Sequence, residues 1–215
     1  MKLETKRCKK VFKIIKKILK NSKSQDPAHD LSHLLRVWKF GIIIGKKKKA
    51  NLGILEPSLL LHDLFRPSKG NTEKNHAEIS AFISEKILAK CSYTTEEINK
   101  ITSVINSHSR TKKSKKQNKC LEAKILYDAD KLDGIGVVGC VRAAMLCSRK
   151  GLNFNQMVKW YLNRIMDVIK NEPFYTKEAK KLSKNKINLS LNFCRDNLGN
   201  NRSQNIIKKY KNKYN

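Results

Sequence analysis

The sequence predicts an all-α protein, and two observations carry that prediction. Apolar residues recur at intervals of three and four in every segment long enough to judge, which is the spacing of one buried helix face. No segment alternates apolar and polar residues as a half-buried strand does. At 215 residues the chain is long enough for one well-buried domain. We therefore expect a single helical domain over residues 1–199 and a basic, frayed tail over 200–215.

Three helices are expected before the first long loop. Residues 5–20 place lysines opposite an apolar face; packing of that face on the core is the simplest interpretation, with membrane-surface binding as the alternative. A helix over 27–44 begins with an Asp-Pro pair, which suits the N-cap and the first helical position. The apolar segment that ends at residue 64 is expected to be the central buried helix. Residues 66–71 (RPSKGN) cannot extend it and are predicted to be a loop.

Six further helices are predicted after that loop. The second of them opens with residues 94–97 (TTEE), a sequence typical of a capping box. Residues 110–119 are polar and basic, and we expect them to form a mobile loop. The expected helices cover residues 75–91, 94–108, 121–132, 134–146, 154–170 and 176–198.

The chain carries a formal net charge of +29, from 47 basic and 18 acidic residues. A balance this basic indicates a polyanionic partner such as nucleic acid, because phosphate contacts give affinity that does not depend on sequence. The basic residues are mostly lysines spread over nearly every segment, beside many asparagines, which is also typical of an AT-biased genome. A functional basic surface and compositional drift therefore both stay open.

Hydropathy and cysteine usage indicate a cytoplasmic protein. No stretch approaches the ~20 apolar residues of a membrane span, and lysines interrupt the apolar run that a signal peptide would need near the N-terminus. The six cysteines are scattered, without Cys-x-x-Cys pairs or zinc-finger spacing, so we expect them to be reduced and partly buried. No membrane partner is expected, and the sequence does not predict an oligomeric state.

The strongest candidate for chemistry is the His62-Asp63 pair, which ends the apolar run of residues 59–61. Burying an imidazole and a carboxylate without partners would cost several kcal/mol. A divalent cation that takes both groups as ligands would compensate that cost directly. Taken alone, the pair could equally cap a helix at the edge of the core.

The remaining histidines and a cluster of acids strengthen the metal interpretation. All five histidines lie in the first half of the chain, at positions 29, 33, 62, 76 and 108. His29, His33 and Arg36 would share one stripe of a helix, being four and three residues apart. Acids at positions 128, 130 and 133 interrupt an apolar helical pattern in a very basic chain, which suggests a cation nearby.

His33, His62-Asp63 and Asp130 stand in the order His, His-Asp, Asp. With the surrounding segments 33–37 (HLLRV), 60–66 (LLHDLFR) and 127–136 (YDADKLDGIG), this order resembles the HD-domain superfamily of metal-dependent phosphohydrolases. The resemblance runs from about residue 26 to about residue 151, and it implies a compact HD-domain helical bundle.

Residues 26–33 (DPAHDLSH) further resemble the opening of small stand-alone HD hydrolases that act on nucleotides. One departure is Phe65, because relatives commonly have Gly before the Arg. A bulky side chain there could narrow the pocket or reposition Arg66.

The resemblance implies that His33, His62, Asp63 and Asp130 hold one divalent metal ion, with His62 and Asp63 as the catalytic pair. Imidazole and carboxylate ligands without thiolate suit Mn²⁺, which we expect first, and also Fe²⁺, Co²⁺, Ni²⁺, Zn²⁺ and Mg²⁺. Such an ion lowers the pKa of a water molecule and absorbs charge that develops on phosphorus.

His76 and His108 leave the metal count open. In the branch of the superfamily that builds two-metal sites, two histidines fall between the His-Asp pair and the final Asp, and these two occupy that order. In other members such histidines bind substrate phosphate. We expect one firmly held metal, and retain a second metal as the alternative.

Four further residues are candidates for substrate binding. Arg36, Arg66 and Lys69 could hold phosphate oxygens, and an arginine suits bidentate contact better than a lysine does. Arg36 could equally be an internal salt-bridge partner of one of the acids. His29 could contact phosphate, orient a metal ligand, or simply occupy the start of a helix.

The predicted function is metal-dependent hydrolysis of a phosphoester or pyrophosphate bond, with a nucleotide or another phosphorylated small molecule as substrate. One alternative is a basic nucleic-acid-binding protein that uses the HD helices as a scaffold. The other is an HD domain that senses a nucleotide by binding it without hydrolysis. The four metal ligands favour the enzyme, because a scaffold used only for its shape would not need them.

Overall fold

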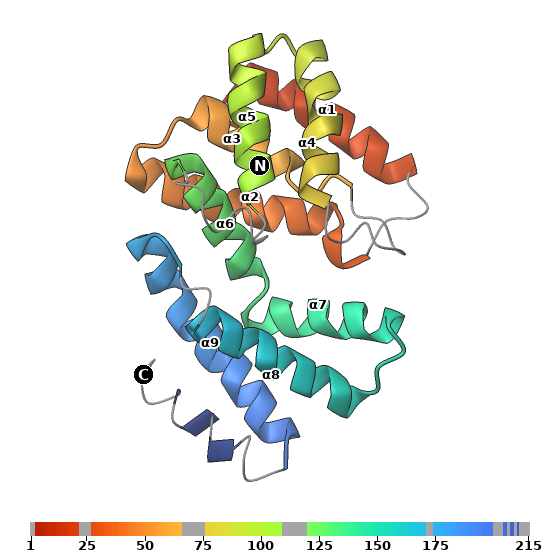
Figure 1. The fold of residues 1–215 in the computed structure, drawn as a ribbon, viewed down its shortest axis with the longest axis vertical. Helices are drawn as coiled ribbons and strands as arrows, with labels where there is room; N and C mark the ends of the chain where they lie inside the picture. The colour runs from red at the N-terminus through yellow and green to blue at the C-terminus, as the bar shows by residue number, and fades with distance from the viewer. Residues whose placement is uncertain are drawn as a thin grey trace. The chain divides into compact units, whose positions relative to one another are not determined.

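A computed structural model describes residues 3–21, 27–65, 76–108, 120–170 and 174–199, together with 204, 205, 207, 208 and 210 of the tail. Over these residues it contains nine α-helices, one short 3₁₀ turn and no strand, which confirms the all-α prediction (Figure 1). The helices are α1 Lys6–Asn21, α2 Leu31–Lys48, α3 Leu52–Leu61, α4 His76–Lys90, α5 Thr95–Ser107, α6 Leu121–Asp133, α7 Gly136–Arg149, α8 Phe154–Lys170 and α9 Lys177–Asn197, and the 3₁₀ turn is Pro27–His29.

The backbone divides into two compact units, Met1–Ala129 and Asp130–Asn215. The first holds α1 to α5 and most of α6, and the second holds the last turn of α6 with α7, α8 and α9. The division falls inside α6, so one continuous helix belongs to both units. That residues 1–199 form a single domain therefore stays a prediction. Most of the predicted tail lies outside the described residues.

Helix α3 is the centre of the first unit, as the sequence predicted. It packs against α1, α2, α4 and α5, and the side chains of Leu55, Leu59, Leu60 and Leu61 have no exposed surface. Helix α2 comes close to α3 because it carries Gly41: a Cβ there would collide with the side chain of Leu59. All residues of α3 from 54 to 61 are buried, the polar Glu56 and Ser58 included, so other parts of the protein enclose this stretch of the helix.

The start of α2 differs from the predicted one. The helix begins at Leu31, where Asp30 is the N-cap and its carboxylate accepts the backbone N–H of His33 at 3.0 Å. The preceding Pro27–His29 segment is a separate 3₁₀ turn. Asp26, the predicted N-cap, lies outside the described residues. Asp30 caps α2 because its side chain reaches the unpaired N–H groups of the first helical turn.

Helix α5 begins as predicted with a capping box: Thr94 and Glu97 each accept the other's backbone N–H. Glu97 also receives two hydrogen bonds from the guanidinium of Arg7, at 2.6 and 2.7 Å, which attach α1 to α5. All six cysteines are free thiols, as expected. No helix among the described residues is both long and apolar enough to span a bilayer.

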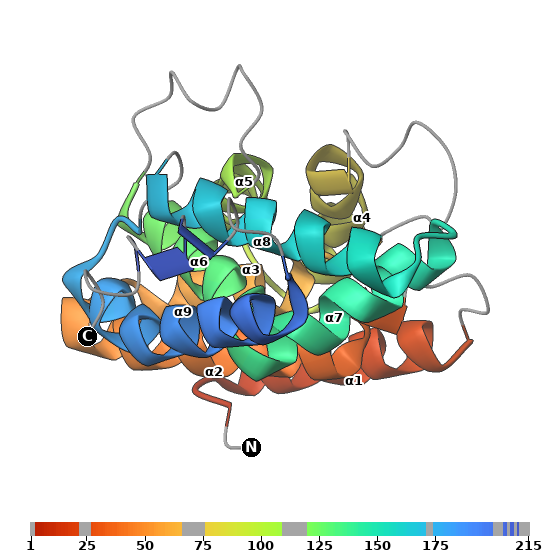
Figure 2. The ribbon, with the colours of Figure 1, turned by 90° about the horizontal axis from the view of Figure 1, so that it is seen from below.

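In the second unit, α7, α8 and α9 lie against one another (Figure 2). The buried hydroxyl of Tyr161 on α8 donates to the carbonyl of Gly136 at 3.1 Å and lies 2.9 Å from the hydroxyl of Ser190 on α9. Arg142 on α7 forms a largely buried ion pair with Asp133 at 3.1 Å. These polar contacts connect the three helices and the end of α6 across an otherwise apolar interface.

Candidate metal centre

Asp63 is a fully buried carboxylate, and the five histidines of the chain surround it. Its Oδ2 atom lies 3.6 Å from Nε2 of His33, 3.8 Å from Nε2 of His62 and 3.9 Å from Nε2 of His29. Its Oδ1 atom lies 3.5 Å from Nε2 of His108 and 3.6 Å from Nε2 of His76. The two oxygens of one carboxylate thus face two different groups of imidazoles.

These side chains come from the ends of helices. His33 occupies the first turn of α2, and His62 is the C-cap of α3 with Asp63 immediately after it. His76 is the first residue of α4, and His108 is the C-cap of α5. A side chain at the end of a helix has no further turn of its own helix beside it. Side chains from several helix ends can therefore converge on one point while the helices pack side by side.

Two sets of side chains have the geometry to hold a metal ion. The first is His33, His62, Asp63 and Asp130, and the second is Asp63, His76 and His108; in each set the ligand atoms lie within 4.8 Å of one another. The structure therefore brings together the four ligands predicted from the sequence. Asp130 comes from α6, and Asp63 is common to both sets.

Backbone carbonyls orient two of the imidazoles. Nδ1 of His62 lies 3.1 Å from the carbonyl oxygen of Leu59, and Nδ1 of His108 lies 2.5 Å from that of Ile105. A carbonyl oxygen only accepts, so Nδ1 carries the hydrogen in both rings, and in the neutral ring Nε2, the atom nearer Asp63, is left free to bind a metal ion. This is the tautomer that a metal-binding histidine needs.

The distances between these atoms match those between ligands of one ion. Two ligands about 2.1 Å from an ion, at an angle of 90–110°, are themselves separated by about 3.0–3.4 Å. Nε2 of His76 and Nε2 of His108 are 3.3 Å apart, and the contacts to Asp63 are only slightly longer. Imidazole and carboxylate without thiolate suit a divalent transition metal. The centre therefore fits a divalent metal ion.

The predicted substrate-binding residues are only partly placed. The guanidinium of Arg36 donates to the hydroxyl of Ser32 at 2.8 Å, and that hydroxyl donates to Asp30 at 2.6 Å. Burial acts to raise the pKa of Asp30, but the hydrogen bonds from Ser32 and His33 and the charge of Arg36 outweigh it and lower that pKa. Arg36 thus takes part in the network that caps α2. This agrees with the interpretation of Arg36 as an internal partner of an acid, and it leaves a phosphate contact open.

Arg66 and Lys69 lie outside the described residues. The side chain of Phe65 is 41% exposed, so this departure from the family pattern is not packed into the core. Sequence reasoning did not single out Lys131, which is buried on α6 one residue after Asp130. A lysine inside the apolar helical pattern of residues 121–133 was the signal that could have found it.

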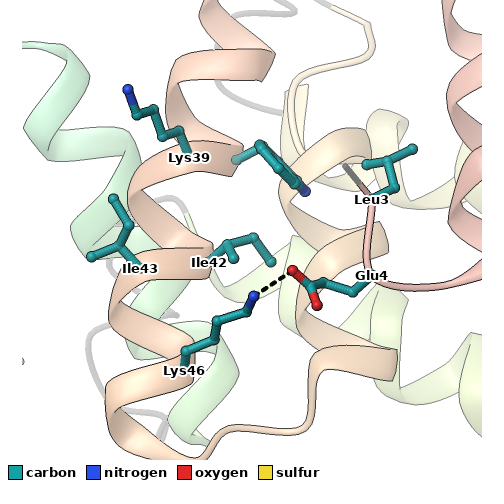
Figure 3. Close-up of a pocket in the computed structure, with 7 residues that line it drawn as sticks. Leu3, Glu4, Lys39, Ile42, Ile43 and Lys46 are labelled. Carbon is teal, nitrogen blue, oxygen red and sulfur yellow. Dashed lines mark ion pairs between the residues drawn. The ribbon is translucent and has the colours of Figure 1, made fainter. Parts of the chain in front are cut away.

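The chain also has a hollow that contains none of the histidines. It has a volume of about 440 Å³ and is lined by residues Leu3, Glu4, Trp38, Lys39, Ile42, Ile43 and Lys46 (Figure 3). An ion pair of 2.6 Å between Lys46 and Glu4 crosses it. Without imidazoles or a cluster of carboxylates, this hollow offers no counterpart to the chemistry around Asp63.

Comparison with known proteins finds a family match over the region that contains most of the candidate metal centre. Residues 30–135 match the family model of the HD domain. The chain is 30% identical over 150 residues to the uncharacterized protein YpgQ of Bacillus subtilis (strain 168), covering 69% of this chain and 70% of that protein. The chain belongs to the HD-domain superfamily.

Solved structures of this superfamily share the fold. A crystal structure of B. subtilis YpgQ in complex with ADP superimposes with a TM-score of 0.69 at 25% identity, covering 89% of this chain and 93% of that one. A predicted HD-superfamily hydrolase from an uncultured Thermotogales bacterium superimposes with a TM-score of 0.61 at 26% identity, covering 87% and 89%. Together with the His/Asp cluster, this HD-domain membership indicates a metal-dependent hydrolase.

Proposed function

We propose that this HD-domain protein hydrolyses a phosphoester or pyrophosphate bond of a nucleotide with the help of divalent metal ions. The observation that carries the proposal is the buried Asp63 with imidazoles at 3.5–3.9 Å around both of its oxygens. The similarity to YpgQ, which has been crystallised with ADP, supports a nucleotide as the substrate. Mn²⁺ is the ion that we would test first, because neutral imidazole favours transition metals over Mg²⁺.

The proposed centre would hold two ions, one with His33, His62, Asp63 and Asp130 as the ligand set and the other with Asp63, His76 and His108. Oδ2 of Asp63 faces the set with His33 and His62, and its Oδ1 faces His76 and His108. Imidazoles beside both oxygens of Asp63 would give each of two ions a ligand set of its own. This geometry favours the two-ion alternative over the single ion that the sequence led us to expect.

When bound, divalent ions supply a water of lowered pKa and stabilise negative charge on phosphoryl oxygens. The ligand atoms and their orientation come from side chains of the protein. His62 and His108 are held in one tautomer by backbone carbonyls, so their lone pairs already point to where the ions would bind. His29 lies 3.9 Å from Asp63 but in neither ligand set, and in this proposal it would donate a hydrogen bond to a substrate oxygen.

The test is a metal analysis of the purified protein followed by a screen for phosphate release. Nucleoside mono-, di- and triphosphates would be incubated with Mn²⁺, Mg²⁺, Co²⁺ and Ni²⁺ in turn. An Asp63→Asn variant purified in the same way is the control, because it keeps the shape of the side chain and removes its charge. Turnover that depends on metal and on Asp63 supports the proposal. Metal that binds without any turnover would instead favour a nucleotide sensor, and equal turnover by the variant would contradict the assignment of the site.

A further inference from the structure

Helix α1 carries a dense and regular row of positive charge. Seven of its sixteen residues are lysines, all of them exposed, and none of its residues is acidic. At 100° per residue these lysines fall within an arc of roughly 120°, and they extend over about 21 Å of helix. We call this row the lysine strip; it consists of Lys6, Lys9, Lys10, Lys13, Lys16, Lys17 and Lys20.

The opposite face of α1 holds the strip in a fixed orientation. Cys8, Val11 and Ile15 have no exposed surface, and α1 packs against α3 and α4. The paired hydrogen bonds between Arg7 and Glu97 attach the same helix to α5. The strip therefore cannot turn toward its own unit, and it faces away from the buried core.

Within the part of the chain that the structure describes, no lysine of the strip forms an ion pair. Lysines three and four residues apart on a helix repel one another, and the strip contains such neighbours along its whole length. A row of anions on this face would convert that repulsion into attraction. This is the charge complementarity that a polyanion offers.

Three features of α1 distinguish among polyanions. A helix that binds a membrane surface inserts its apolar face, but Cys8, Val11 and Ile15 of that face are buried in the protein, and Ile18, at 37% exposure near the end of the helix, leaves little to insert. A site for single strands needs exposed aromatic rings on which bases stack. The strip has none, and the ring of Phe12 beside it is only partly exposed and lies under Lys16. The strip also lacks arginine, the residue that most often reads base edges.

We propose that the lysine strip of α1 binds the phosphate backbone of double-stranded nucleic acid without regard to its sequence. Lysines act as point charges toward phosphates, and phosphate contacts position a protein without specifying a sequence. Seven such charges in one row can contact several phosphates at once, since a duplex carries one charge per about 1.7 Å of its axis. This binding is separate from the hydrolysis proposed for the metal centre.

The experiment measures binding to fluorescein-labelled duplexes of about 20 base pairs, DNA and RNA, by anisotropy over a series of salt concentrations. The strip variant carries Lys→Gln at positions 9, 13, 16 and 20. The matched control carries Lys→Gln at 177, 180, 181 and 184, four exposed lysines of α9. Both variants lose the same charge. Because the four α9 lysines span only about 10 Å, they should contact fewer phosphates together.

The strip variant should bind at least about tenfold more weakly near 0.1 M salt, and the slope of log K against log salt should fall by roughly 3 to 4, at about 0.9 per lost contact. The α9 control should bind like the wild type. Lys→Arg at the same four strip positions should restore binding, and circular-dichroism melting should show that all variants fold. The Asp63→Ala variant should bind duplex normally, so that a failure of the proposed hydrolysis would leave this result unaffected.

Three results would overturn the proposal. An equal loss in the strip variant and the α9 control would mean that total charge alone drives binding. Equal or tighter binding of a single strand of the same length would contradict the choice of a duplex. Strip-dependent binding to vesicles that contain phosphatidylserine, without binding to either duplex, would assign the strip to a membrane surface instead.

Discussion

Removing the imidazole of His76 should take away one of two bound metal ions. Its Nε2 lies 3.6 Å from Oδ1 of Asp63 and 3.3 Å from Nε2 of His108, and these three residues form the second ligand set. The variant His76→Ala leaves that set with two protein ligands. Loss of an outer partner of a ligand already costs 10–100-fold in metal affinity, so loss of a ligand itself should cost at least about 100-fold.

The expected change in thermal stability follows from the linkage between metal binding and unfolding. At Mn²⁺ about 100-fold above the dissociation constant of the second ion, that ion stabilises the wild-type protein by about 2.7 kcal/mol. A 100-fold loss of affinity reduces this to about 0.4 kcal/mol. For a chain of this size, 1 kcal/mol corresponds to about 2–4 °C. The rise in Tm that Mn²⁺ produces should therefore be smaller by about 5–9 °C in the variant.

The assay combines a metal count by equilibrium dialysis with thermal unfolding across a Mn²⁺ titration. His29→Ala is the matched control, since His29 borders the same carboxylate but belongs to neither ligand set. The control should keep two ions per chain, and His76→Ala should keep one and lose most of its turnover. If both wild type and His76→Ala bound one ion, and only KM rose, His76 would be a phosphate contact. If count, Tm and KM were all unchanged, the second site would not exist.

Three further outcomes are expected. Asp63→Ala should lose both bound metal and phosphate release, measured by metal analysis and by turnover at background level. Arg7 holds the pKa of Glu97 at about 2, below its usual 4.5, so this pair stabilises the fold above about pH 4.5 and ceases to do so as the pH falls toward 2. The Glu97→Gln variant should therefore lose up to about 1 kcal/mol at neutral pH and show a flatter dependence of Tm on pH in that window. Gly139→Ala should cost about 1–3 kcal/mol in chemical denaturation, because the new Cβ would lie 2.6 Å from the hydroxyl of Tyr161 and would collide with a backbone carbonyl.

Local signals in the sequence predicted the helices well, because each signal acts within one or two turns. The capping box of Thr94 and Glu97 is an example, since both partners lie in the same turn of α5. The start of α2 shows the limit of such signals. Two aspartates, at positions 26 and 30, could each cap this segment, and only the backbone conformation around Asp30 shows which one does.

The candidate metal centre was predicted from the order of its ligands rather than from their distances. His33, His62-Asp63 and Asp130 could be named from the sequence because the superfamily keeps this order. The roles of His76 and His108 could not, because an imidazole that binds metal and one that binds phosphate look alike in sequence. Which oxygen of Asp63 these two imidazoles face depends on the packing of α4 and α5 against α3, so it cannot be predicted from signals within one segment.

By itself, the sequence determined the all-α fold, the central buried helix and the ligand types, because helical periodicity and the preference of metals for imidazole and carboxylate are properties of residues and their near neighbours. Only the tertiary structure decided that the two oxygens of one carboxylate face two groups of histidines, and that the apolar face of α1 packs on the core and is not left for a membrane surface. Both depend on how helices far apart in the chain are packed. Burial of Cys8, Val11 and Ile15 fixes the rotation of α1, and the approach of α2, α4 and α5 to α3 brings His33, His76 and His108 within 4 Å of Asp63.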